Sequence, residues 1–202
     1  MTTTVNVKPR AVRTVSVLEG PNVYLRKIVP FDVNANYYRW MNDPDVAQFL
    51  EVRHTRRSLK DLREYVSNII ERKEDAFFAI CLNETGQHVG NIKLGPINKD
   101  HGFANIGLVI GEREYWGKGI ATEAVSLVTR YAFETLKLHK VLAGCYENNL
   151  ASLRVFKKLG FKKEGVQVSQ WLCKGKYVDG ILLAKINPAP DECCPVRSRP
   201  QI

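Results

Sequence analysis

Residues 109–123 read Val109-Ile110-Gly111-Glu112-Arg113-Glu114-Tyr115-Trp116-Gly117-Lys118-Gly119-Ile120-Ala121-Thr122-Glu123. We expect a buried strand, then a loop with two glycines, then a long helix. Glycine allows positive φ and lets a ligand approach the backbone closely. The first N–H groups of a helix lack acceptors and, together with the helix dipole, favour an anion. The stretch therefore predicts either a diphosphate site, to which Lys118 adds charge, or a glycine-assisted tight turn.

Two familiar phosphate motifs do not match this loop. A Walker loop would end in Gly-Lys-Ser/Thr at a different spacing. The dinucleotide fingerprint needs three glycines in an early βαβ unit.

The rest of the chain alternates apolar runs with turn residues. Strands are predicted at 22–29, 76–82, 88–94, 103–110, 140–146, 165–172 and 176–186. Helices are predicted from an Asp32 cap to Met41, at 45–50, at 58–72 with Ser58 as N-cap, at about 119–136, and at 149–159 with Gly160 as the stop. Three consecutive strands joined by turns favour an α/β fold of the α+β type, a mixed twisted sheet with helices on both faces.

Composition bounds the class of protein. The chain has 202 residues, 45% hydrophobic and 25% charged, with a net charge of +9. We expect one domain at 21–187, an N-terminal arm at 1–20 with a short edge strand near Val15–Val17 or none, and a tail at 188–202. The positive charge is dispersed and no nucleic-acid module is recognisable.

The sequence also gives no sign of a membrane protein or a metalloprotein. Without an apolar leader or a membrane-spanning run, we expect a cytoplasmic protein that binds neither membrane nor nucleic acid. The five cysteines have no zinc or disulfide spacing, so no metal is expected, and Cys145 is interpreted as a core residue.

A second stretch changes the interpretation of the glycine loop. It reads Glu147-Asn148-Asn149-Leu150-Ala151-Ser152-Leu153-Arg154-Val155-Phe156-Lys157-Lys158-Leu159-Gly160-Phe161. Together, in this order, the two stretches resemble the GNAT superfamily of N-acetyltransferases, and within it the branch of ribosomal-protein N-terminal acetyltransferases. The resemblance spans about 23–186 and implies a sheet splayed open in its middle.

The resemblance implies that acetyl-CoA lies in that opening as a co-substrate. Its pyrophosphate would contact the backbone of Gly117, Lys118, Gly119, Ile120, Ala121 and Thr122, after Trp116. Its pantetheine arm would run beside Val109, Ile110 and Gly111 and would be held by Asn149. Ser152 and Phe156 are further candidates for binding the co-substrate. The family usually has Gln or Arg where Trp116 stands, a change that leaves the backbone donors intact.

Catalysis needs a proton donor for the thiolate and a base for the ammonium. Many family members place a Tyr where this chain has Phe156, which cannot give a proton. Ser152 is the remaining hydroxyl, and it either acts as the acid or helps to cap its helix. Glu112 is the favoured base, although it would equally serve as a carboxylate that neutralises Arg113. A backbone N–H near Ile110 would stabilise the oxyanion.

The acceptor is expected to meet the first third of the chain. Candidate substrate-binding residues are Trp40, Glu51, Arg53 and His54. Arg53, His54, Arg56 and Arg57 form a basic cluster that is either a solvated face or a site for an anionic acceptor.

The predicted function is therefore transfer of acetyl from acetyl-CoA to a primary amine, such as a nucleotide-linked amino sugar. A protein N-terminus is the alternative acceptor, and a catalytically silent acyl-CoA-binding module is the alternative of another class. We expect a monomer or homodimer.

Overall fold

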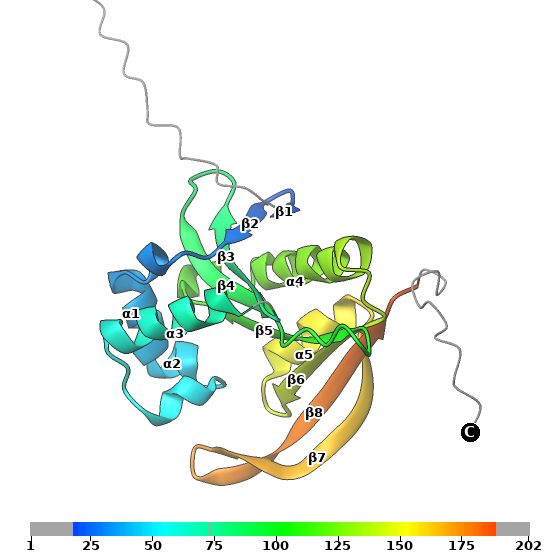
Figure 1. Cartoon of the computed structure of the whole chain (residues 1–202). Coiled ribbons are helices and arrows are strands. Elements are labelled where there is room, and N and C mark those ends of the chain that lie inside the picture. Colours follow the sequence, from blue (N-terminus) through cyan, green and yellow to red (C-terminus); the bar gives the residue numbers. More distant parts are fainter. Residues whose placement is uncertain (1–17, 73, 189–202) are drawn as a thin grey trace, which may run out of the picture.

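A computed structural model describes residues 18–72 and 74–188. The expectations for residues 1–17 and 189–202, including a strand near Val15–Val17, lie outside this part of the chain. Figure 1 shows one mixed sheet with helices on both sides. Its strands are β1 (Leu18–Glu19), β2 (Val23–Lys27), β3 (Ala76–Leu82), β4 (His88–Leu94), β5 (Phe103–Ile110), β6 (Lys140–Tyr146), β7 (Lys162–Cys173) and β8 (Lys176–Ile186).

The strand order is β1-β2-β3-β4-β5-β6-β8-β7, and only the β5–β6 pair is parallel. That pairing runs from Phe103↔Lys140 to Ile106↔Ala143 and then stops. Both strands continue, β5 to Ile110 and β6 to Tyr146. The two strands therefore diverge, which confirms the predicted mixed sheet that opens in its middle.

The α-helices are α1 (Ala35–Asn42), α2 (Pro44–Ala47), α3 (Leu59–Glu71), α4 (Ile120–Arg130) and α5 (Leu150–Lys158). Single 3₁₀ turns are η1 (Pro30–Asp32), η2 (Glu51–His54) and η3 (Arg113–Tyr115), and a π-helical turn, η4 (Tyr131–Thr135), extends α4. The predicted long helix thus exists, with its last turn widened.

Each face of the sheet has its own hydrophobic core. Buried side chains of α4 and α5 pack on one face, and those of α1 and α3 pack on the other (Figure 1). Cross-strand pairing assigns the residues of β5 to these faces. Phe77, Lys93 and Gly107 form one row, which shares the α1–α3 face with Val109. Leu108 lies on the α4–α5 face.

The first residues of α3 and α1 test the two predicted N-caps, with opposite outcomes. Ser58 caps α3 and exchanges hydrogen bonds with Asp61, so that prediction is confirmed. The predicted Asp32 cap is wrong, because Asn34 is the N-cap of α1 and accepts the N–H groups of Asn36 and Tyr37. Asp32 lies one turn earlier, where Arg26 holds both of its oxygens at 2.6 and 2.7 Å.

Glu123, the last residue of the central stretch, has a structural role. Its carboxylate accepts hydrogen bonds from the backbone N–H groups of Asn22 and Val23 and from the Asn22 amide, at 2.8–2.9 Å. These bonds attach the β1–β2 turn to the first turn of α4, and so fix the start of that helix relative to the sheet.

Candidate active site

The backbone of β5 points into the gap where the strands diverge. Gly111 donates to Val89 on β4, and Asn105 accepts from Gly95 on the same side. Because peptide groups alternate along a strand, those of Leu108 and Ile110 face the other way, toward β6. Beyond Ile106 no β6 residue pairs with them. The N–H groups of Leu108 and Ile110 are therefore directed into the gap, as a carbonyl ligand would require.

Trp116 closes part of this edge. Its indole N–H donates to the Ile110 carbonyl at 2.8 Å, and 42% of the residue is exposed. The side chain that replaces the usual Gln or Arg therefore binds the end of β5.

The glycine loop has the geometry of an anion site. Gly117 and Gly119 have φ of 75° and 84°, and a Cβ on either would meet nothing within 4 Å. The first helical hydrogen bond of α4 joins the Glu123 N–H to the Gly119 carbonyl, so the N–H groups at 120–122 have no acceptor in the helix. Backbone donors without helical acceptors fit a diphosphate, and the side chain of Lys118 lies beside this helix start, over the Tyr115 ring.

The second motif forms α5 on the α4–α5 side of the sheet. Asn149 caps α5 by accepting the Ser152 N–H at 3.1 Å. Ser152 is half-buried, and none of the described residues bonds its hydroxyl. Phe156 is 4% exposed and packs edge-on against Phe161 at 5.0 Å. The cap thus belongs to Asn149, while Ser152 keeps its hydroxyl available and Phe156 is a core residue.

Glu112 is buried but not alone. It is 7% exposed, and its Oε1 accepts from Arg39 at 2.6 Å and from the Trp40 indole at 3.1 Å. Arg113, its expected partner, binds Asp43 and Asp45 of the α1–α2 corner instead. Trp40 itself is 1% exposed and lies where a Cβ on Gly111 would be. These contacts join the helical layer, formed by α1, α2 and α3, to the loop that precedes α4.

Of the four acceptor candidates, Glu51, Arg53 and His54 gather near the end of β6, and Trp40 does not. The Tyr146 hydroxyl donates to Glu51 Oε1 at 2.7 Å, and Arg53 lies over the Tyr146 ring at 5.0 Å. Arg53 also donates to the carbonyls of Leu50 and Leu172, at 2.9 and 3.0 Å. The Arg53 side chain is only 15% exposed, so its guanidinium mainly holds η2 to the β7–β8 hairpin.

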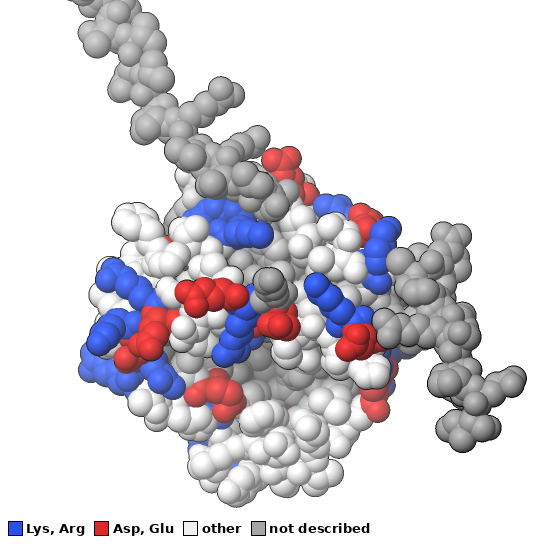
Figure 2. Space-filling view, viewed as in Figure 1, with Lys and Arg blue, Asp and Glu red and all other residues white. Residues whose placement is uncertain are grey.

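A groove of about 720 Å³ lies between the helical layer and that hairpin. Its walls include Arg53, His54, Arg56 and Lys174, with Asp43 as the carboxylate among its lining residues. Asp43 is already paired with Arg113, whose guanidinium holds the pKa of that carboxyl below its usual range. The groove is therefore positively charged. On the face shown in Figure 2, positive and negative side chains are interspersed.

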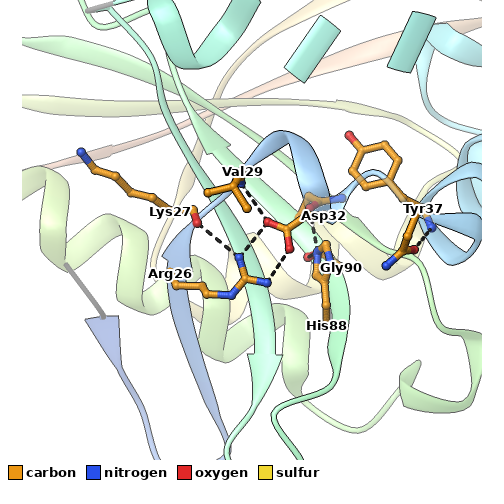
Figure 3. Close-up of polar contacts among 9 residues, drawn as sticks. Arg26, Lys27, Val29, Asp32, Tyr37, His88 and Gly90 are labelled. Carbon is orange, nitrogen blue, oxygen red and sulfur yellow. Dashed lines mark hydrogen bonds and ion pairs between the residues drawn. The ribbon is translucent and has the colours of Figure 1, made fainter. Parts of the chain in front are cut away.

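A buried polar cluster supports the start of the helical layer (Figure 3). Burial works to raise the pKa of Asp32, but hydrogen bonds from Arg26 and the Val29 N–H outweigh it and hold that pKa below its usual range. Nearby His88, edge-on to the Trp40 ring at 5.1 Å, contacts the Gly90 carbonyl. Burial lowers the pKa of His88, so its imidazole is neutral at pH 7.

Sequence reasoning missed three residues of this region. Tyr146 is the last residue of a predicted strand and directly precedes the second motif, which could have identified it. Arg39 and Lys174 carried no such signal, because Arg39 meets Glu112 across 73 residues and Lys174 joins the groove only where the hairpin lies near η2.

Residues 18–72 and 74–188 contain no cluster of three His, Cys, Asp or Glu able to hold a metal, and no helix there could span a membrane. Cys145 is buried, which raises the pKa of its thiol to about 12. A thiol protonated at neutral pH agrees with its interpretation as a core residue.

Known proteins share this architecture. A Bacillus subtilis relative described as a probable N-acetyltransferase is 32% identical, over 87% of this chain and 100% of its own length. The Escherichia coli spermidine N(1)-acetyltransferase is 32% identical, over 78% of this chain and 77% of its own.

Two solved structures have the same fold. A Vibrio cholerae spermidine N-acetyltransferase, in complex with CoA and spermine, superposes with a TM-score of 0.74 at 22% identity, covering 82% of this chain and 95% of that one. A Vibrio fischeri ribosomal-protein-S5-alanine acetyltransferase gives 0.74 at 23% identity, covering 86% and 98%.

The model of the GNAT acetyltransferase domain matches residues 22–162. The chain belongs to the GNAT acetyltransferase family and is an N-acetyltransferase whose co-substrate is acetyl-CoA.

Proposed function

We propose that this N-acetyltransferase acts on the primary amine of a small acceptor that also carries negative charge, such as an amino sugar linked to a nucleotide diphosphate. The observation that carries the proposal is the positively charged groove between η2 and the β7–β8 hairpin. Arginine and lysine side chains suit phosphate oxygens. Within the groove, Arg56 and Lys174 are exposed, while Arg53 is engaged in holding the hairpin.

For the co-substrate, we propose that the backbone donors at 117–122 hold the pyrophosphate and that Val109, Ile110 and Gly111 hold the pantetheine arm. The Ile110 N–H, directed into the gap, would stabilise the developing oxyanion. Ser152 is proposed as the proton donor to the leaving thiolate, since its hydroxyl has no other partner among the described residues.

A polyamine acceptor is the second candidate, because the E. coli relative at 32% identity is named for spermidine. Polyamines are cationic, and the groove cations Arg56 and Lys174 would repel them. The same objection applies to a protein N-terminus, the acceptor suggested by the ribosomal-protein branch, unless acidic residues follow it. The charge of the groove therefore favours the anionic acceptor.

The test is a screen of amine acceptors with acetyl-CoA, with release of free thiol as the readout. It compares nucleotide-linked amino sugars, spermidine, and peptides with acidic or basic second residues. We expect the anionic acceptors to react best. Preference for spermidine or basic peptides would refute the anionic acceptor, and no thiol release with any amine would leave only the silent acyl-CoA-binding alternative.

The groove variant sharpens this test. Replacing Arg56 and Lys174 by Gln should raise KM for the anionic acceptor by about tenfold or more, because charge-assisted hydrogen bonds are worth roughly 1.5–3 kcal/mol. Lys60→Gln, on the exposed face of α3 away from the groove, is the matched control. Affinity for acetyl-CoA, measured by calorimetry, should stay unchanged in both.

A further inference from the structure

We propose that Glu51 receives the proton that the acceptor ammonium must lose, and that Tyr146 is the residue that positions it. This inference rests on the proposed acetyl transfer to an amine and assigns its base. It replaces Glu112, the carboxylate favoured by the sequence, in that role.

The first support is where Tyr146 lies. Ile106 of β5 and Ala143 of β6 are paired and belong to the core under α4 and α5. Alternation along β6 then puts Gly144 and Tyr146 on the opposite face, which Gly107 and Val109 of β5 share. Both strands are unpaired with each other beyond Ile106 and Ala143. Tyr146 therefore stands at the open end of the gap, on the face covered by α1–α3.

That face also has room for an acceptor. Gly107 and Gly144 are exposed, and a Cβ built on either meets nothing within 4 Å. An amine that approaches from this face would therefore meet no side chain at the strand positions of Gly107 and Gly144.

The second support is the state of the Glu51 carboxylate. Its Oε1 accepts the Tyr146 hydroxyl at 2.7 Å, and Arg53 lies 3.4 Å from the same atom. Among the described residues, its Oε2 has only His54 nearby, at 3.9 Å, and the side chain is 64% exposed. Burial and the bond to Glu51 raise the pKa of Tyr146 to about 12, so the phenol stays protonated and remains a donor. One oxygen is held in place while the other remains open to a ligand.

The third support is the contrast with Glu112. That carboxylate is buried, and a guanidinium and an indole N–H share its Oε1. Protonation of that buried carboxylate would weaken the 2.6 Å Arg39 ion pair, whereas the Arg53 contact of the exposed Glu51 is longer, at 3.4 Å. Glu51 gains its proton on an exposed oxygen and loses it to solvent.

The proton balance is complete without another reactant. The ammonium gives one proton to Glu51, and the nitrogen lone pair then forms the C–N bond at the acetyl carbon. The C–S bond breaks with its electron pair on sulfur, Ser152 gives its hydroxyl proton to the thiolate, and the second nitrogen proton returns to the Ser152 oxygen. Glu51 returns its proton to water.

The experiment compares two acceptors: the best amine from the screen, and an analogue with an alkoxyamine (O-alkylhydroxylamine) nitrogen in its place, which is unprotonated at neutral pH. With the ammonium acceptor, Glu51→Gln should lower kcat by about 100-fold or more, the size typical of general base loss. With the unprotonated analogue the loss should be less than about tenfold. Tyr146→Phe, which keeps the ring under Arg53, should show the same pattern with a loss of about tenfold.

Glu64→Gln, an exposed carboxylate on α3, is the matched control and should behave as wild type. Melting temperature and acetyl-CoA affinity, measured on every variant, show whether each is folded and binds co-substrate. Equal losses with both acceptors, or a raised KM at unchanged kcat, would overturn the role of Glu51. Wild type that acetylates no amine would instead refute the proposed function.

Discussion

The two sides of the gap between β5 and β6 offer different chemical groups, backbone N–H groups on one side and side chains on the other. The loop at 116–122 offers backbone N–H groups, placed by positive-φ glycines and the start of α4. The acceptor side offers side chains from η2, the end of β6 and the β7–β8 hairpin, which meet across 95 to 119 residues of sequence. A site made of backbone depends on local conformation. A site made of side chains depends on how distant segments pack. Substitutions on the two sides should therefore have different effects on binding and stability.

The largest expected effect is on the backbone side. Gly119→Leu should weaken acetyl-CoA binding by roughly 100-fold, since losing two charge-assisted hydrogen bonds costs about 3 kcal/mol. The φ of 84° disfavours any side chain, and the added one would project into the open space at the helix start. Calorimetry measures the affinity.

Gly160→Leu is the matched control for backbone strain. Gly160 has φ of 81°, and a Cβ there also meets nothing within 4 Å, but it lies at the end of α5. It should destabilise the protein to a similar degree and leave acetyl-CoA affinity intact. Equal loss of affinity in both variants would show that strain, and not the loop, controls binding.

The next effect concerns the framework of the acceptor side. Asp32→Asn should lower the free energy of unfolding by about 2–3 kcal/mol, because it leaves the partly buried Arg26 guanidinium without its carboxylate. Asp61→Asn, at an exposed capping position, should cost less. Urea denaturation at pH 7 measures both, and equal losses would mean that the Arg26–Asp32 pair does not anchor η1.

The stability of the protein at acid pH should also depend on the Arg26–Asp32 ion pair. The folded pKa of Asp32 is lowered, so its stabilisation is complete above the unfolded value of about 3.9 and is lost as pH falls through the folded pKa. Wild type should therefore lose stability below about pH 4 more steeply than Asp32→Asn.

A smaller effect is expected at Ser152. Ser152→Ala should lower kcat by about tenfold and leave acetyl-CoA affinity unchanged, because protonation matters only as the thiolate leaves. Asn149→Ala removes the cap of α5 and should instead cost about 1 kcal/mol of stability. An unchanged kcat in Ser152→Ala, with chemistry limiting the rate, would remove Ser152 from the mechanism.

The smallest effect is the pH dependence at His88. Its folded pKa is lowered, so the neutral ring stabilises the fold fully above the unfolded value of about 6.5, and this stabilisation is lost as pH falls toward the folded pKa. The urea midpoint of wild type should decline from pH 7.5 to 5.5, and that of His88→Gln should decline less. Parallel declines would assign the acid sensitivity to other groups.

Much of the fold was predictable because its signals are local. The bounds predicted for 76–82, 88–94, 103–110 and 140–146 match β3 to β6, since each run is apolar and ends at turn residues. The Ser58 cap was predictable for the same reason, because the cap depends only on residues close to it in sequence. The Asp32 cap failed because Arg26, six residues earlier, binds its carboxylate and Asn34 takes its place. A capping residue with a competing ion-pair partner cannot be recognised from spacing alone.

The sequence by itself determined the order of elements, the glycine loop before α4 and the family, because these depend on short runs of residues. The tertiary structure alone decided which carboxylates and cations meet. It joined Glu112 to Arg39 instead of Arg113, engaged Arg53 in holding the hairpin, and brought Glu51 to Tyr146. Ion pairs and hydrogen bonds act over a few ångströms, and only the packed chain decides which side chains come that close.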